Sequence, residues 1–365
     1  MGIRHGFGFA DLGKAQRSLY GDRRGISGFG KERARMRAII YRRYGTPQVL
    51  HAQEIPEPTP GPRDVLVKVQ ASSVNAADLE YLHGTPFVAR MGSGIFRPHR
   101  RVLGFDVAGT VAEVGSDVAR FRPGDPVFAD LFNHGFGGFA EYACAPEAAF
   151  APMPPSLSFE EAATIPHSGV QAIQGLERGE TIEPGQKVLI NGAGGCVGPF
   201  AIQLAKAYDA DVTAVDRASK LEFMRSVGAD HVIDFERDDY TRSGKTYDWV
   251  LDLAAHRPLI DSRRALGATG RYVMAGGPTG RFFRLLAVGS LLTRGTDRTM
   301  TLLMWKPFAP ADVATLTDLL QAGKIKPVID RTYPLDDVPE AIRRLESGAA
   351  RGKLVIRIAS NGGVR

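Results

Sequence analysis

The feature that most constrains the fold is the stretch KVLINGAGGCVGPFAIQLAKAY, residues 187–208, in which a short apolar run enters a helical pattern through clustered glycines. A phosphate can approach a helix N-terminus only where the backbone N–H groups are bare and no Cβ intervenes. We therefore expect Gly192 to support the tight turn, Gly195 to admit a pyrophosphate, and Gly198 to let the helix pack on the sheet. The spacing departs from strict G-x-G-x-x-G, because Ala193 holds its first position.

A second apolar run, DVTAVD, completes a β-α-β pattern and ends in Asp216, 24 residues after Gly192. An acid at this place accepts hydrogen bonds from the ribose hydroxyls of a dinucleotide and repels a 2′-phosphate. Arg217 and Lys220 follow and can bind a 2′-phosphate if Asp216 turns away. We expect NAD(P)H as the cofactor, with NADH in preference to NADPH, and expect Ser219 and Glu222 to cap the next helix. The predicted cofactor site comprises Gly192, Ala193, Gly195, Cys196, Val197, Gly198, Asp216, Arg217, Lys220 and Gly276.

The 365-residue length favours two domains, since single cores stop growing at roughly 250–300 residues. Short alternating runs such as DVLVKVQASSVN predict a mostly antiparallel β domain over residues 36–168, completed by residues 309–360. Alternating strands and helices predict an α/β, doubly wound parallel sheet over residues 169–308, with MTLLMW as its last strand. Residues 1–35 lack apolar periodicity and are expected to be a disordered extension or the product of a misplaced start.

Charge and cysteine content exclude several classes of protein. The net charge is +6, but residues 1–35 hold eight Lys and Arg against three acids, so the remaining chain has no basic excess that would indicate nucleic-acid binding. The longest uncharged run, residues 188–205, contains four glycines and Pro199, which argues against a membrane span. Two cysteines build neither a disulfide framework nor a four-cysteine zinc site, and a cytoplasmic location fits best.

Six segments in order from Met36 to Ile358 resemble the medium-chain dehydrogenase/reductase superfamily, in its zinc-free quinone oxidoreductase-like branch: VLVKVQASSVNAAD, RVLGFDVAGTVAEVG, GFAEYACAP, GQKVLINGAGGCVG, VGADHVIDF and RGKLVIRI. The resemblance implies a GroES-like catalytic domain made from both ends of the chain around a central Rossmann domain, with the active site between them. It implies hydride transfer from NAD(P)H to a small-molecule quinone or α,β-unsaturated carbonyl. It also suggests a homodimer, in which MTLLMW pairs across a two-fold axis.

The residues at the family's catalytic zinc positions predict that no metal is bound. Asn75 in VNAAD replaces a cysteine, Phe105 in GFD replaces a histidine, and His167 in IPHSG stands where a later cysteine would be. One ligand of three does not hold a catalytic zinc. Without a Lewis acid an unactivated alcohol is a poor substrate, whereas a quinone or enone accepts hydride at a conjugated position.

The catalytic candidates are Asn75, Tyr81, His134 and His167. The resemblance places Asn75 beside the nicotinamide, where its amide could hydrogen-bond the acceptor oxygen or the cofactor ribose, although a turn residue ending a strand is an alternative interpretation. Glu80 occupies a position where many relatives have tyrosine, so Tyr81, His134 and His167 are the candidate proton donors, with solvent as the alternative to all three. Aromatic side chains that stack on planar acceptors are expected from Phe132, Phe136 and Trp305, the last at the end of the final Rossmann strand, with an ordinary core position as the alternative.

Two other functions remain open on the sequence. The first is a nucleotide-binding structural or assembly protein without significant catalysis, and the second is a zinc-type alcohol dehydrogenase. The apolar run GRFFRLLAVGSLLTR, residues 280–294, is interpreted as a lid or subunit-contact helix in preference to a membrane-surface helix.

Overall fold

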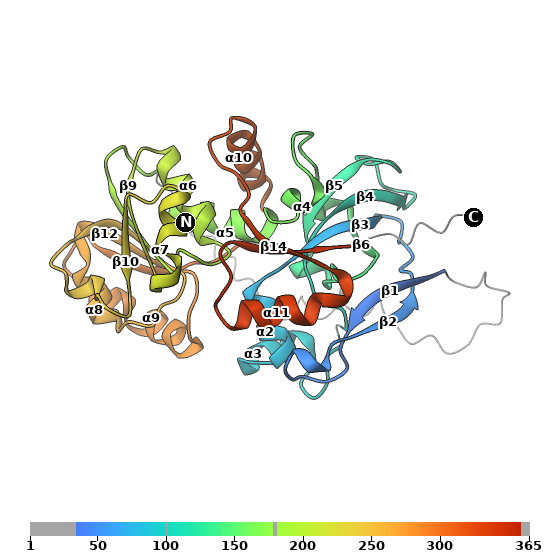
Figure 1. Ribbon diagram of the computed structural model, residues 1–365, viewed down its shortest axis with the longest axis horizontal. Coiled ribbons are helices and arrows are strands. Elements are labelled where there is room, and N and C mark those ends of the chain that lie inside the picture. Colours follow the sequence, from blue (N-terminus) through green and yellow to red (C-terminus); the bar gives the residue numbers. More distant parts are fainter. Residues whose placement is uncertain (1–33, 100, 178–180, 359–365) are drawn as a thin grey trace, which may run out of the picture.

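The computed structural model of the chain describes residues 34–99, 101–177 and 181–358. The predicted extension, residues 1–35, therefore lies outside the described residues except for its last two. Two sheets organise the chain, and Figure 1 shows them in opposite halves of the molecule. None of the helices in the described part of the chain has the length and apolar character that a bilayer crossing requires.

The first half contains a six-stranded, all-parallel sheet, as predicted for the central segment. Its strand order is β10-β9-β8-β11-β12-β13. The strand bounds are β8 Lys187–Asn191, β9 Asp211–Asp216, β10 His231–Asp234, β11 Tyr247–Asp252, β12 Leu266–Met274 and β13 Thr299–Leu302. The carboxyl ends of β8, β9 and β11 share one edge, where the glycine-rich turn follows β8.

Helices cover both faces of this sheet, because successive strand residues point to opposite sides. In β8, Val188 and Ile190 join the core beneath one set of helices, and Leu189 joins the core beneath the other. The helices of the first face are α5 Pro166–Leu176, α6 Gly198–Ala207, α7 Leu221–Ser226 and α10 Pro310–Gln321. Those of the second face are α8 Leu259–Arg264 and α9 Thr279–Leu292.

The second half contains a mostly antiparallel sheet of order β14-β15-β3-β4-β5-β7, with β6 paired to β3. The strand bounds are β3 Asp64–Val74, β4 Asp106–Val114, β5 Pro126–Asp130, β6 Tyr142–Pro146, β7 Phe150–Pro152, β14 Ile329–Pro334 and β15 Lys353–Arg357. Strand β15 lies between β14 and β3, which confirms that the late strand RGKLVIRI rejoins the first domain. A separate hairpin pairs β1 Arg35–Ile40 with β2 His51–Pro56, and the helices are α2 Ala76–His83, α3 Phe87–Ser93, α4 Phe159–Ala162 and α11 Val338–Glu346.

Two local expectations are wrong. Strand β13 ends at Leu302, because its partner β12 ends at Met274 in the same register, so Trp305 lies beyond the strand. Ser219 does not cap a helix, because it lies inside a 3₁₀ turn, Ala218–Lys220, that runs directly into α7.

Candidate active site

The glycine-rich turn has the shape that a phosphate requires. Gly192 has a φ of +83°, in the left-handed region that favours glycine. A Cβ on Gly198 would lie 2.0 Å from the Ala193 carbonyl oxygen, so helix α6 can approach the turn only with glycine there. A Cβ on Gly195 would meet only the Gly192 carbonyl oxygen, at 3.5 Å. The turn is therefore closed on the helix side and open at Gly195, where a pyrophosphate fits.

Asp216 at the end of β9 is buried and holds the turn in place. Its Oδ2 accepts the N–H of Gly194 at 2.9 Å, and its Oδ1 accepts the N–H of Arg217 at 2.8 Å. The Lys220 ammonium lies 3.8 Å from Oδ2 and donates to the Gly194 carbonyl at 3.1 Å. Burial lowers the pKa of Lys220, while Asp216 opposes this change. Asp216 and Lys220 thus both hold the turn through Gly194.

The other predicted cofactor residues surround the same edge of the sheet. Val197 stands immediately before α6, and the Cys196 sulfur lies 4.0 Å from the Val74 carbonyl oxygen of the other domain. Burial raises the pKa of the Cys196 thiol, so the side chain is an uncharged packing group. Gly276 follows β12, and a Cβ there would lie 2.2 Å from the Leu253 carbonyl oxygen, so it is required for packing between strand ends.

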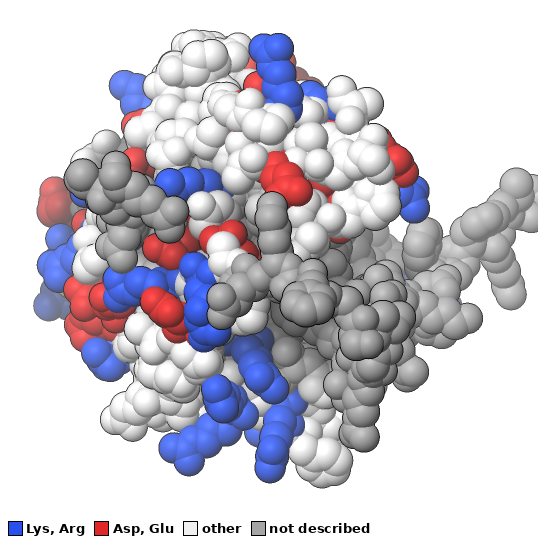
Figure 2. Space-filling model, turned by 90° about the vertical axis from the view of Figure 1, so that its right-hand side faces the viewer, with Lys and Arg blue, Asp and Glu red and all other residues white. Residues whose placement is uncertain are grey.

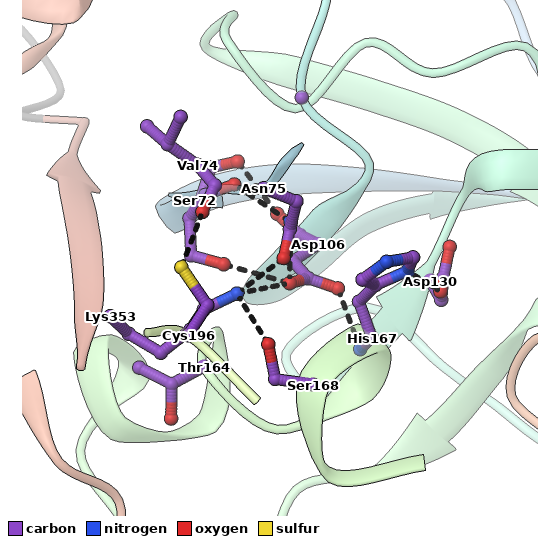
Figure 3. A network of polar contacts seen from close by, with 12 residues as sticks. Ser72, Val74, Asn75, Asp106, Asp130, Thr164, His167, Ser168, Cys196 and Lys353 are labelled. Atoms are coloured by element: carbon purple, nitrogen blue, oxygen red, sulfur yellow. Dashed lines mark hydrogen bonds and ion pairs between the residues drawn. The ribbon is translucent and has the colours of Figure 1, made fainter. Parts of the chain in front are cut away.

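A buried polar network lies where the two domains meet (Figure 3). Its centre is Lys353, the first residue of β15, whose side chain is fully buried. The Lys353 ammonium donates to Asn75 Oδ1 at 2.6 Å, to Asp106 Oδ2 at 3.1 Å and to Ser168 Oγ at 3.2 Å. Asp106 Oδ2 also accepts the Ser73 hydroxyl at 2.7 Å. All three ammonium protons of Lys353 therefore have acceptors.

This network dictates how the amide of Asn75 is oriented. Its Nδ2 donates to Asp106 Oδ2 at 2.9 Å and to the Ser73 carbonyl at 3.3 Å. A flipped amide would direct its NH₂ group at the Lys353 ammonium and its oxygen at a carboxylate, which electrostatics forbids. Both amide hydrogens are consequently used inside the protein. Asn75 therefore has no amide hydrogen to offer a substrate oxygen.

Asp78 fixes the backbone on which Asn75 sits. One carboxyl oxygen accepts the N–H of Asn75 at 2.9 Å, and the other accepts the N–H of Gly104 at 2.9 Å. Burial raises the pKa of Asp78 to about 7, although both backbone hydrogen bonds lower it. Asp78 thereby ties the start of α2 to the turn before β4, and holds Asn75 between β3 and α2.

Aromatic rings pack around His167 on the other side of the network. Its ring centroid lies 4.8 Å from that of Phe105 and 4.5 Å from that of Trp305, and Phe132 lies 5.1 Å from Trp305. Tyr81 packs edge-on against Phe132 at 5.8 Å. The structure thus brings the predicted residues Tyr81, Phe132, His167 and Trp305 together with Phe105, and Phe136 packs against Tyr81 at 4.7 Å. The remaining candidate, His134, ends the same 3₁₀ turn that begins at Phe132.

His167 has a carboxylate partner that the sequence did not reveal. Its Nδ1 lies 3.3 Å from Asp130 Oδ2, and its backbone N–H donates to Asp106 Oδ1 at 2.9 Å. Burial raises the pKa of Asp130, and the bond to His167 lowers it. With Nδ1 directed at a carboxylate, Nε2 faces away from Asp130 and is the atom that can exchange a proton with a ligand.

Sequence reasoning missed Asp78, Asp106, Asp130, Ser168 and Lys353. Two signals pointed toward them: Lys353 opens the apolar run KLVI, and Asp106 opens the apolar run DVAGTV. A charged residue within a buried strand requires a partner of opposite charge. That rule predicts a pair, but it does not identify which acid meets which base.

Family comparisons match both halves of the chain. Residues 61–155 match the alcohol dehydrogenase GroES-like domain, and residues 227–356 match a zinc-binding dehydrogenase domain. The chain is 34% identical over 334 residues to the chloroplastic quinone-oxidoreductase QR1 of Triphysaria versicolor, a match covering 88% of this chain and 98% of that protein. It is also 34% identical over 361 residues to the mitochondrial NAD(P)H oxidoreductase RTN4IP1 of Bos taurus, covering 88% and 89%.

A solved structure is similar to this chain over nearly the whole described fold. The quinone oxidoreductase from Coxiella burnetii superposes with a TM-score of 0.81 and 31% identity, covering 89% of this chain and all of that one.

Two glycine variants should separate the folding role of the turn from its binding role. Gly198→Ala should lower the free energy of unfolding by about 1–3 kcal/mol, since the new methyl group meets the Ala193 carbonyl. Gly195→Ala should leave stability nearly unchanged but weaken nicotinamide dinucleotide binding by roughly tenfold or more, because its methyl group fills the phosphate space. Denaturant unfolding and cofactor titration measure the two effects. Equal binding losses without a stability difference would contradict this division.

Removing one partner of the central ion pair should be costly. Lys353→Met leaves Asp106 buried without its cation and should lower the free energy of unfolding by about 3–5 kcal/mol. The double variant Lys353→Met, Asp106→Asn removes both charges of this pair and should recover a large part of that loss. Urea unfolding of both variants provides the measurement, and additive losses in the double variant would argue against direct coupling.

Proposed function

Because the chain belongs to the medium-chain dehydrogenase/reductase superfamily, in its quinone-oxidoreductase-like branch, we propose that it is a zinc-independent, NAD(P)H-dependent reductase of quinones or α,β-unsaturated carbonyls. The observation that carries the proposal is the His167–Asp130 pair, which lies inside a wall of aromatic rings beside the Asn75 network. A planar, conjugated acceptor matches such a wall in shape and stacking. One relative, 32% identical over 337 residues, is a 2-methylene-furan-3-one reductase of Solanum lycopersicum.

The chemistry requires a hydride and a proton. A reduced nicotinamide, when bound, supplies the hydride to a conjugated carbon of the acceptor. The electron pair displaced toward the carbonyl oxygen then needs a proton, and His167 Nε2 is the group that we propose supplies it. Asp130 stabilises the protonated imidazole through Nδ1 and fixes the ring orientation. Bulk water restores the proton to His167 after the product leaves.

Asn75 receives a different role in this proposal. Its amide hydrogens are bound to Asp106 and Ser73, so it does not stabilise the acceptor's oxygen. Asn75 Oδ1, already bound by the Lys353 ammonium at 2.6 Å, is the side-chain atom that can also accept a hydrogen bond from a cofactor hydroxyl or carboxamide. Asn75 therefore positions the cofactor, and Tyr81 contributes one edge of the aromatic wall.

The donor atoms at the zinc positions support zinc independence. Phe105 offers no lone pair, and Asn75 is held by a lysine ammonium that would repel a cation. His167 remains as one donor, whereas a catalytic zinc takes about three protein ligands. We accordingly expect turnover to be insensitive to chelators, and stoichiometric zinc in the purified protein would contradict this part of the proposal.

Dimerisation and location complete the proposal. Strand β13 forms one edge of the parallel sheet, and we propose that it pairs with a second copy.

The scarcity of cysteine favours the cytoplasm, whereas the names of the matched relatives place them in chloroplasts and mitochondria. Sedimentation and cell fractionation are the direct measurements.

Replacing the proposed proton donor should reduce turnover specifically. His167→Gln should lower kcat for a small quinone or enone by about 10²-fold or more, while the dissociation constant of the cofactor changes little. Tyr81→Phe and His134→Gln are matched controls, because both positions were alternative donors, and each should retain most of the activity. Steady-state kinetics over a panel of acceptors checks these outcomes. An inert wild-type chain that still binds cofactor would instead indicate a nucleotide-binding protein without catalysis.

Removing the charge of Asp216 should shift cofactor preference. Asp216→Asn keeps an oxygen for the Gly194 N–H but no longer repels a 2′-phosphate, so the ratio of kcat/KM for NADPH over NADH should rise roughly tenfold. Arg217→Ala should change the ratio in the opposite direction. If Asp216→Asn leaves the ratio unchanged while Arg217→Ala alters it, Arg217 controls the choice.

A further inference from the structure

A group of large apolar side chains protrudes from α3 and the loop that follows it. Phe87 and Met91 are 60% and 69% exposed and stand four residues apart, on one face of the helix. Ile95 and Phe96 in the next loop are 49% and 91% exposed. Because Phe96 buries almost none of its side chain, it contributes little to the stability of the fold. Its exposure beside three other large apolar side chains favours a role in binding.

Arginines lie directly beside these apolar residues. A surface hollow of about 440 Å³ adjoins the loop, and its walls carry no acidic side chain. Its lining residues are Arg42, Arg43, Gln48, Val49, His51 and Arg97. In Figure 2, Lys and Arg side chains gather at the bottom of the face shown, and no acidic side chain is drawn among them. The sequence from 85 to 101 contains four arginines and no acid.

Hydrogen bonds hold the apolar and basic parts together as one surface. The Tyr44 hydroxyl bonds to Ser93 Oγ at 2.8 Å and donates to the Gly94 carbonyl, joining the Arg42–Arg43 turn to the end of α3. The Arg90 guanidinium covers the Tyr44 ring at 4.7 Å. The arrangement is therefore built into the fold. We call it the α3 surface: Phe87, Met91, Ile95 and Phe96 with Arg42, Arg43 and Arg97.

We propose that the α3 surface docks the protein on an anionic phospholipid bilayer. Protruding apolar side chains enter the acyl boundary, while flanking arginines bind the phosphate headgroups and keep their charge in water. A hollow lined by three arginines and a histidine, without an acid, offers a headgroup phosphate several charge-assisted hydrogen bonds. This inference does not depend on the proposed reaction, since it concerns a surface and not the His167 site.

Helix α9 carries similar residues and provides a matched control. Phe283, Leu286 and Leu291 are 66%, 64% and 64% exposed, and Arg281 and Arg284 stand among them. Helix α9 packs on β13, the edge strand proposed above to pair with a second copy. The dimer proposed above would place α9 near the contact between two copies, and if the α3 surface is the lipid-binding one, changes in α9 should leave lipid binding intact.

The test is vesicle co-sedimentation of the full chain with phosphatidylcholine vesicles, with and without phosphatidylglycerol. The wild type should bind the anionic vesicles, bind the neutral ones far more weakly, and dissociate as salt rises. Two combined variants should each reduce partitioning into anionic vesicles by about tenfold or more. The first carries Phe87→Ser and Phe96→Ser, and the second carries Arg42→Gln, Arg43→Gln and Arg97→Gln. Circular dichroism and cofactor binding of the same samples verify folding.

The control variants are Phe283→Ser with Leu286→Ser, and Arg281→Gln with Arg284→Gln and Arg294→Gln. Vesicle binding that survives the α3 changes, or that is lost only with the α9 changes, would overturn the proposal. Equal binding to neutral and anionic vesicles would also overturn it. So would a wild type that binds no vesicles but self-associates, if the α3 variants abolish that self-association. Inorganic phosphate, tested alone at the same ionic strength, should bind the protein only weakly. Tight binding of free phosphate would show that the hollow is a site for small anions and not for a bilayer.

Discussion

The buried ion pair between Lys353 and Asp106 is the interaction on which the candidate site depends. Both side chains are fully buried, so neither charge is tolerated without the other. Lys353 comes from β15, Asp106 from β4, and the residues they bind come from the end of β3 and the start of α5. One pair therefore sets the orientation of the Asn75 amide and the position of the His167 backbone. It thereby fixes where Asn75 and His167 lie relative to each other.

The sequence was most informative where function depends on local conformation. The turn from Gly192 to Gly198 follows from backbone sterics within one β-α unit, and its glycines occupy the expected places. The return of β15 to the first sheet was likewise readable, through its apolar pattern and the resemblance. Trp305 was misplaced, because strand length is set by the neighbouring strand's end and not by the strand's own hydrophobicity.

Pairings between distant residues were beyond the sequence. Asp106 and Lys353 stand 247 positions apart, and the Asp130–His167 contact joins different elements through tertiary packing alone. Burial of a charge predicts that a partner exists, yet several acids qualified for each base. The same limit applied to Asn75: the resemblance suggested that its amide binds the acceptor oxygen or the cofactor ribose, and only the full set of its partners showed that both amide hydrogens are occupied.

The position of Lys353 in the chain has a consequence for biosynthesis. A ribosome makes the protein from its N-terminus, so β3, β4 and the whole Rossmann unit are translated before Lys353 is added. Until then Asp106 and Asn75 lack the cation that orders them, and an edge of β3 is uncovered. Nascent chains therefore hold the glycine-rich turn from Gly192 to Gly198 before the network around Asn75 can close. The turn can form during synthesis, whereas the hydrogen bonds that orient Asn75 form only after β15 has been translated.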